Sequence, residues 1–404
     1  MTPRAPMRSR LDRLGFDARF GALVAALALI WLALAWATDG VFLSPRNLYN
    51  LSIQTCVTAI AACGMVYLIV ARQIDLSVGS LMAFTGMLVA WTQTNWLGSA
   101  GAMGWLVSIG VGLLAGLIVG AFQGWWVAYR GVPAFVVTLA GYLMWRGAAF
   151  LVADGQTLAP LADAYQRLGG GQDGSLGPAW SWGLGVAGVA ALAAQTVAKR
   201  RSRARYGARL APLWADALKL AVSGGALLAF VAVVCAYPDP GSDAGAGKGL
   251  GLPVLVLLVV ALWLDVVARR TRFGRHVWAL GGNPEAALLA GLPTRRLLLQ
   301  LFMLMGGLSA VAAVITTARL GSGTHSIGQM AELYVIAATV IGGTSLSGGS
   351  GSIAGAIVGA LLIQTLDNGM VLLDVASAKR QIFIGMILIA AVWFDGLYNR
   401  GARR

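Results

Sequence analysis

The sequence predicts an all-α, polytopic membrane protein, and three observations lead to that fold class. Hydrophobic residues make up 58% of the 404-residue chain and charged residues only 11%, whereas about a quarter of the residues in soluble domains are charged. The mean hydropathy is +0.75. The apolar residues form long continuous runs and do not show the alternating pattern of a membrane β-barrel.

A helix that crosses a bilayer needs about 20 mainly apolar residues. By that measure about twelve transmembrane segments are predicted. The segments at 78–93 and 330–343 are short for a full crossing, and we expect them to be half-helices beside polar breaks. The twelve segments are 21–38, 50–70, 78–93, 105–128, 133–153, 179–198, 218–236, 253–268, 297–318, 330–343, 353–373 and 381–398.

Four clusters of Lys and Arg set the expected orientation. They lie before the first segment, after the sixth, after the eighth and at the end of the chain. With twelve crossings all four face the same side, which the positive-inside rule makes cytoplasmic. The expected organisation is a cytoplasmic tail (1–20), a transmembrane domain (21–398) with cytoplasmic loops at 199–217 and 269–296, and a second cytoplasmic tail (399–404).

The net charge of +14 does not indicate a nucleic-acid partner. A dedicated binder would present its basic residues on one face of a soluble fold, whereas here they collect in short loops and tails between apolar segments. We expect membrane lipid, and no nucleic acid, to surround the apolar segments.

The most informative stretch runs from Asp75 to Ser80, between two long apolar segments. Its carboxylate and hydroxyl groups need polar partners, because an unpaired polar group is costly in hydrocarbon. The sequence Leu-Ser-Val-Gly-Ser at 76–80 recurs as Leu-Ser-Gly-Gly-Ser at 346–350. Interrupted segments in corresponding positions of two halves point to a transport path, so we predict an internal repeat and a path or gate. Its candidate residues are Asp75, Ser77, Gly79, Ser80, Ser347, Gly349, Asp367 and Asn368.

Several roles remain open for these residues. Asp75 can bind a cation, bind sugar hydroxyls, or cap the following helix through nearby backbone amides. Ser77 and Ser80 can bond the broken backbone or a passing ligand. Asp367 and Asn368 lie deep in an apolar segment, where they can line a cavity or form an interhelical hydrogen bond.

Three further features concern polar residues and packing. Glu332 can cap the helix it begins or form an external gate, and Arg146 can pair with an acid or reach toward the interface. Glycines four residues apart, at 112–124 and 351–359, predict close helix packing.

A short helix outside the membrane is predicted at 283–291. Asn283 is a good N-cap, Pro284 suits the first helical position, and Glu285 complements the helix dipole. Ala286 and Ala287 favour helix, and Gly291 can end it. The helix presents small apolar residues and an acid, a surface that needs a partner.

No metal or cofactor site is predicted in this chain. His276 and His325 fall on opposite sides of the membrane in the predicted topology, and the sequence offers no nucleophile–base pair or metal cluster that would indicate an enzyme.

The motifs Ile74–Ser80, Gly342–Leu346 and Gly281–Ala287 resemble the permease subunits of bacterial ABC sugar importers of the ribose, xylose, arabinose and galactoside branch. Segments 124–133 and 366–370, and an insertion near 154–220, resemble the xylose permeases in particular. The resemblance extends from about residue 40 to 398.

The resemblance implies a homodimeric pore in the bacterial inner membrane, with both termini cytoplasmic. It implies a separate ABC ATPase, which uses ATP and Mg²⁺ and docks on the helix that includes Gly282, Asn283, Pro284, Glu285, Ala286, Ala287 and Gly291. A periplasmic sugar-binding protein would deliver the monosaccharide, and access to the pore would alternate. Two other functions remain open: an ABC permease for another sugar or for branched-chain amino acids, and an ion-coupled secondary carrier.

Overall fold

The computed structural model describes residues 18–96, 103–171, 174–207, 212–238 and 247–402. The chain forms two compact units, residues 1–49 with 175–250 and residues 50–174 with 251–404. Several basic residues of the predicted clusters lie outside the described residues: Arg4, Arg8, Arg10, Arg13, Arg209, Arg403 and Arg404.

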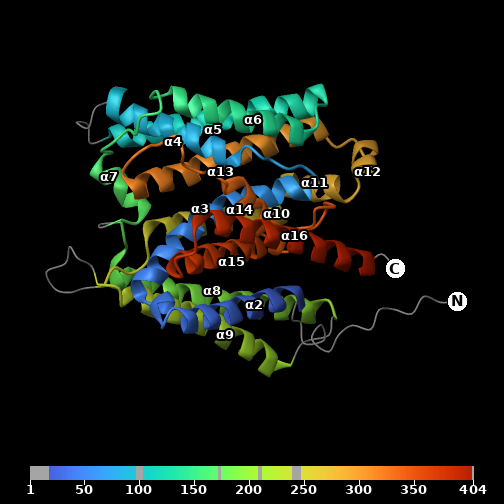
Figure 1. Cartoon of the computed structure of the whole chain (residues 1–404). Helices are drawn as coiled ribbons and strands as arrows, with labels where there is room; N and C mark the ends of the chain where they lie inside the picture. Colours follow the sequence, from blue (N-terminus) through green and yellow to red (C-terminus); the bar gives the residue numbers. More distant parts are fainter. Residues whose placement is uncertain (1–17, 97–102, 172–173, 208–211, 239–246, 403–404) are drawn as a thin grey trace. The chain divides into compact units, whose positions relative to one another are not determined.

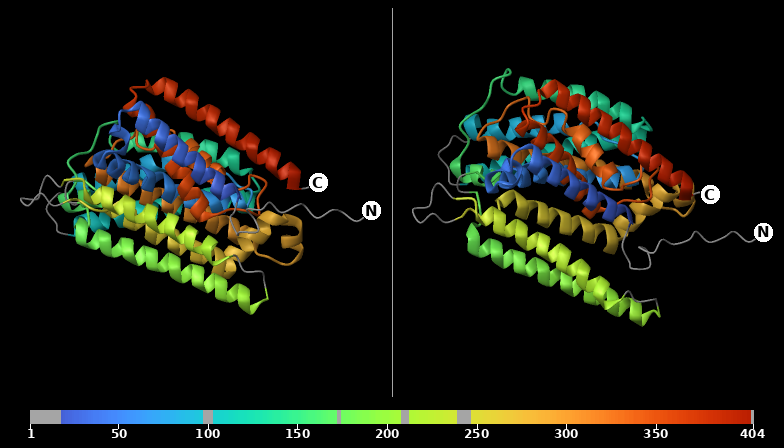
Figure 2. Two further views of the ribbon diagram at one scale, coloured as in Figure 1. Left: turned by 90° about the horizontal axis from the view of Figure 1, so that it is seen from below. Right: turned by 60° about the horizontal axis from the view of Figure 1, so that its bottom comes forward.

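The described residues of the first unit are mainly helical (Figure 1). Its elements are α2 (Ala18–Ala37), η1 (Val41–Leu43), α8 (Gly177–Arg205) and α9 (Leu213–Cys235). Helices α8 and α9 lie side by side in both views of Figure 2, and Gly185 and Gly188 of α8 meet Val231 and Leu227 of α9. Small residues let helix backbones approach in this way.

Helix α8 is longer than the segment predicted at 179–198. It continues through the basic residues to Arg205, and α9 begins at Leu213. Much of the expected loop at 199–217 is therefore helical. Arg and Lys are good helix formers, and Arg200 forms an ion pair of 2.7 Å with Asp216 of α9.

The second unit contains the remaining helices, with α11 and α12 at one end and α7 at the other (Figure 1). We call these the α12 end and the α7 end. The helices are α3 (Pro45–Val70), α4 (Val78–Trp91), α5 (Gly104–Arg130), α6 (Ala134–Leu151), α7 (Asp163–Gln166), α10 (Leu252–Arg270), α11 (Arg272–Gly282), α12 (Pro284–Leu289), α13 (Thr294–Leu320), α14 (Ala331–Ile341), α15 (Ile353–Leu372) and α16 (Ser377–Ala402), with single turns η2 (Thr92–Trp96) and η3 (Arg167–Gly169).

The prediction of an all-α membrane protein is confirmed. Each of the twelve predicted segments coincides with a helix, and eight described helices are long and apolar enough to cross a membrane. Helices α4 and α14 have only 14 and 11 residues, in agreement with the expected half-helices. Helix α11, by contrast, was not predicted.

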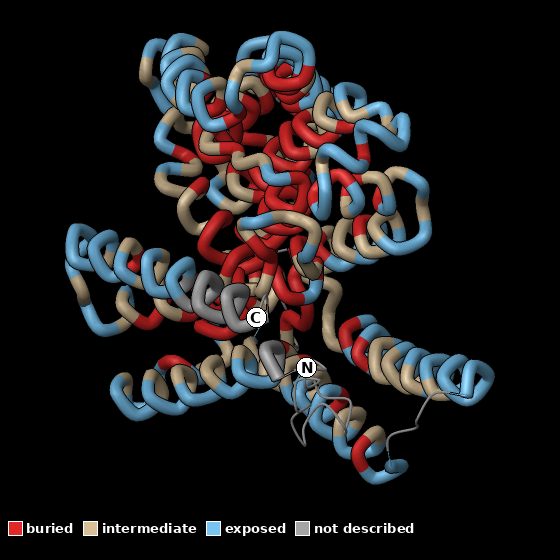
Figure 3. The backbone as a smooth tube through the Cα atoms, turned by 90° about the vertical axis from the view of Figure 1, so that its right-hand side faces the viewer, coloured by how far each residue is buried: buried red, intermediate tan, exposed pale blue. Residues whose placement is uncertain are grey.

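Helix α3 lies at the centre of the core of the second unit. In its most apolar stretch 89% of the residues are buried, against 28% or less for α5, α6 and α10. Buried segments appear as long red stretches in Figure 3. Helices α5, α6 and α10 instead expose large apolar side chains such as Leu114, Phe135 and Leu262, as lipid-facing helices do.

The predicted glycine seams are confirmed as close helix contacts. A methyl group on Gly116 or Gly120 of α5 would overlap the backbone of α13, and one on Gly355 or Gly359 of α15 would overlap the end of α14. These contacts hold α5 against α13 and α15 against the half-helix α14.

Candidate functional site

The first break in the helices lies between α3 and α4, around Asp75. The Asp75 side chain is 1% exposed and that of Ser77 is fully buried. Asp75 Oδ1 accepts hydrogen bonds from the Ser77 backbone N–H (2.8 Å) and from Ser77 Oγ (2.6 Å). Of the roles left open for Asp75, this geometry fits local capping of the broken backbone.

Helix α5 completes the polar network at the first break. Gln123 of α5 donates from Nε2 to Ser77 Oγ (2.9 Å), and Ser80 Oγ donates to the Ser77 carbonyl (2.8 Å). The Gln123 side chain is 1% exposed. The sequence reasoning missed Gln123, although a lone amide among the glycines of an apolar helix is itself a signal.

A second non-helical stretch, residues 321–330, precedes α14. Arg146 of α6 donates from Nη1 to the carbonyls of His325 and Ile327, both at 2.8 Å. Its hydrogen-bond partners are backbone carbonyls, and it also interacts electrostatically with an acid on another helix, Glu332 of α14, as one of the two roles considered from the sequence has it. Non-helical backbone inside a membrane protein requires such partners.

The two breaks touch at Gly79 and Gly328. A methyl group on Gly79 would overlap the Gly328 carbonyl and Glu332 Oε2, and one on Gly328 would overlap the Gly79 carbonyl. Glu332 is 7% exposed, and its Oε2 has no hydrogen-bond partner. Glu332 lies in the first turn of α14, and its side chain packs against the first turn of a different helix, α4.

The N-termini of α4 and α14 thus meet inside the second unit. From this crossing α4 runs toward Gly323, which packs on Ala90, and α14 runs toward the start of α15, where Gly342 packs on Gly355. Two half-helices with adjoining N-termini are an arrangement found at the substrate sites of transporters.

The second copy of the repeat, residues 346–350, does not occupy an equivalent place. Ser347 is exposed and its Oγ bonds that of Ser345 (2.8 Å), and the Gly349 N–H donates to the Val70 carbonyl (2.9 Å). These residues form a turn at the α12 end, and the partner of the Asp75 break is the stretch at 321–330. Only the second copy is a glycine-rich turn, because the single glycine of the first copy, Gly79, lies within α4.

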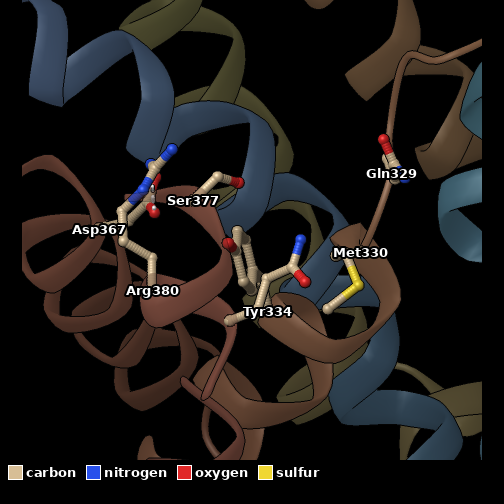
Figure 4. A pocket seen from close by; sticks show the side chains of 7 residues that line it. Gln329, Met330, Tyr334, Asp367, Ser377 and Arg380 are labelled. Carbon is tan, nitrogen blue, oxygen red and sulfur yellow. Dashed lines mark hydrogen bonds and ion pairs between the residues drawn. The ribbon is translucent and has the colours of Figure 1, made fainter. Parts of the chain in front are cut away.

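Asp367 lines a pocket with residues of α14, α15 and α16 (Figure 4). Its Oδ1 forms an ion pair of 3.1 Å with Nη1 of Arg380, and Arg380 Nε is buried without a partner. The structure therefore combines both roles left open for Asp367, an interhelical contact and a polar wall. Asn368 is buried one position further along. The lining residues are Gln329, Met330, Tyr334, Asp367, Ser377, Arg380 and Gln381.

The short helix predicted at 283–291 is present as α12. Asn283 caps it, with Oδ1 accepting from the Ala286 N–H (3.0 Å), and Gly291 follows with φ +76°. Glu285 and Ala286 are exposed and Ala287 is buried. Leu288 and Leu289, which the sequence reasoning did not single out, are 64% and 89% exposed.

Within the described part of the chain, no three His, Cys, Asp or Glu residues are placed to bind a metal ion together.

Comparison with known proteins places the chain in a family. Residues 47–392 match the family described as branched-chain amino acid transport system, permease component. The chain belongs to this permease family. The matched region contains both breaks, the pocket and α12, so the geometry above is that of a membrane-spanning transport subunit.

Curated relatives of this permease have names that refer to sugars. It is 40% identical over 382 residues to the xylose transport system permease protein of Escherichia coli K12, covering 94% of this chain and 92% of the relative. It is 30% identical to the ribose import permease protein of the same strain (93% and 92% covered) and 29% identical to the L-arabinose ABC transporter permease protein of Azospirillum brasilense (99% and 94% covered). No solved structure matches the chain.

Arg146 offers a direct test of how the permease stabilises its second break. The substitution Arg146→Met keeps a long apolar stem and removes the donors to His325 and Ile327. A buried carbonyl without a partner costs about 1–3 kcal/mol, so we expect the free energy of unfolding to fall by about 2 kcal/mol or more. The measurement is denaturant unfolding of the purified permease in detergent.

Arg130→Met is the matched control, because Arg130 is exposed and lies over the Trp125 ring. Its loss should cost less than about 1 kcal/mol. Equal stability of the two variants would contradict the assigned role of Arg146.

Proposed function

We propose that this permease is the membrane subunit of an ATP-driven importer whose cargo is xylose or a closely related monosaccharide. The observation that carries the proposal is the 40% identity to a xylose permease along 94% of the chain. More distant relatives are named for ribose and arabinose, which are also sugars. Their names support a sugar as the cargo.

The crossing of the two breaks supports a neutral cargo. Helix N-termini carry partial positive charge and attract anionic groups. Here Asp75 lies just before the first turn of α4, and Glu332 lies in the first turn of α14 beside Gly79. Both half-helix ends therefore already have a carboxylate from the chain itself. An amino acid substrate would need an unoccupied half-helix N-terminus to bind its carboxylate. A sugar has no carboxylate and does not need one.

The remaining assembly follows from the same proposal. Two copies of the permease form the pore, and a separate ABC ATPase, which uses ATP and Mg²⁺, docks at the α12 end. Arg269 and Arg270 end α10, and Arg272 and Arg275 lie in the first turn of α11. These basic residues support a cytoplasmic position for this end. Both chain termini would then be cytoplasmic, and a periplasmic sugar-binding protein would deliver cargo at the α7 end.

The test of the proposed function is uptake into proteoliposomes that contain the permease, its cognate ATPase and its binding protein. We expect ATP-dependent accumulation of labelled xylose that persists when ionophores collapse ion gradients, and no accumulation of leucine. Uptake by the permease alone, driven by a proton or sodium gradient, would instead establish an ion-coupled carrier. Leucine uptake without xylose uptake would establish an amino acid permease.

The docking role of α12 has its own test. Glu285→Lys combined with Leu289→Lys replaces an exposed acid and an exposed leucine on α12. We expect the variant to insert normally and to lose copurification with the ATPase, because both charge and apolar contact are removed. Asp374→Lys, a charge reversal at another exposed acid, should still copurify. Retention of the ATPase by the α12 variant would rule out this docking site.

We further propose that the pocket around Asp367 contacts the sugar. Hydroxyl, amide, carboxylate and guanidinium groups line it, and Figure 4 shows Tyr334 between Met330 and Ser377. These groups suit the hydroxyls of a sugar, which both donate and accept hydrogen bonds.

Tyr334→Phe tests this contact by removing one hydroxyl. A neutral hydrogen bond is worth about 0.5–1.5 kcal/mol, so the xylose uptake rate should fall about 2- to 10-fold. Tyr129→Phe, at an exposed tyrosine of α5, is the control. An unchanged rate in Tyr334→Phe would remove Tyr334 from the sugar path.

A further inference from the structure

Arg72 joins the end of α11 to the start of the first break. Its Nε donates to the Gly281 carbonyl (2.8 Å) and its Nη2 to the Gly282 carbonyl (3.2 Å). Gly281 and Gly282 are the last residues of α11, and the final carbonyls of a helix lack partners within it. The guanidinium supplies those partners and complements the negative end of the helix dipole.

The backbone around this contact is packed without space for side chains. A methyl group on Gly281 would overlap the Val70 carbonyl at the end of α3, and one on Gly349 would approach the Cα atom of Gly282. The same Val70 carbonyl accepts from the Gly349 N–H (2.9 Å). The end of α11 is therefore held against both the end of α3 and the turn before α15.

Arg72 itself adopts φ +61°, a left-handed conformation that is unfavourable for a residue with a side chain. Glycine would fit this backbone without strain. What arginine adds at this position is its pair of hydrogen bonds to α11. The side chain is exposed, so burial of its apolar stem does not explain its presence.

The junction connects two functional elements over a short length of chain. Gly282 is followed directly by Asn283, the cap of α12, and Arg72 is three residues before Asp75. A planar guanidinium that bonds two carbonyls fixes orientation as well as distance. Displacement of α12 and the end of α11 would therefore act on the backbone that leads into the Asp75 break.

We propose that Arg72 is a positioning residue that transmits movement of α12 to the Asp75 break, and so couples ATP hydrolysis to opening of the path. The inference rests on the proposed function, because it requires an ATPase docked on α12. It assigns to Arg72 a role in coupling and none in contact with sugar or nucleotide.

The test measures sugar accumulated per ATP hydrolysed in proteoliposomes that contain the complete complex. Arg72→Gly removes both hydrogen bonds and relieves the left-handed strain, so the fold is not expected to weaken. We expect this ratio to fall at least fivefold, while ATP hydrolysis per complex stays within twofold of the unmodified complex. Arg72→Lys, which keeps the charge but not the planar fork, should give an intermediate ratio.

Asp39→Gly is the matched control. Asp39 is also an exposed residue with positive φ, +49°, and its replacement relieves the same kind of strain far along the chain from α11. Its ratio should equal that of the unmodified complex. A merely structural Arg72 would lower stability or yield without changing the ratio.

Three results would overturn the inference: an unchanged ratio in Arg72→Gly, an equal fall in Asp39→Gly, or loss of the ATPase from the Arg72→Gly complex. The last would make Arg72 part of the docking surface. If Arg72→Gly does not fold, a ratio in Arg72→Lys equal to the unmodified value would overturn it. Failure of the proposed function is distinct, because the unmodified complex would then accumulate no sugar.

Discussion

The structure of this permease depends on one constraint, which is that non-helical backbone within a membrane must find polar partners inside the protein. Two stretches, around Asp75 and at 321–330, break the helices. At the first, Asp75 accepts from the Ser77 backbone N–H, and Gln123 of α5 bonds the Ser77 hydroxyl. At the second, Arg146 of α6 bonds two backbone carbonyls. An unsatisfied backbone group in hydrocarbon costs several kcal/mol, so these few side chains determine whether the breaks can exist at all.

Because the breaks are satisfied internally, they can serve as fixed points for movement. Gly79 and Gly328 bring the two half-helices into backbone contact, and the glycine seams hold α5 against α13 and α14 against α15. Closely packed elements move as discrete bodies and do not deform continuously. Alternating access in such a permease would then be displacement of these bodies about the crossing, with α12 and Arg72 at the end where the proposed ATPase would act.

Helix positions and the capping of α12 could be predicted from the sequence, because apolar run length and cap residues are local signals. Asp75 was also recognisable, as a carboxylate inside an apolar region. The distant member of its network was not: Gln123 bonds Ser77 from 46 positions away, and only the fold brings the two together. The surroundings of the repeat at 346–350 could not be predicted either, because its letters do not show that its turn lies against the end of α3. The left-handed conformation of Arg72 could not be predicted, because glycine is the usual residue in that conformation and arginine gives no sign of it.

The central claim is that the Asp75 break is a buried, internally bonded structure and not an open binding site. Cysteine labelling tests it most directly, in a permease whose own cysteines, Cys56, Cys63 and Cys235, are replaced. Ser80→Cys places a thiol at a fully buried position, and Ser347→Cys places one at an exposed position. In the absence of nucleotide, a hydrophilic maleimide should label Ser347→Cys rapidly and leave Ser80→Cys unmodified. Labelling of both at similar rates would show that water fills the break, and would contradict the account.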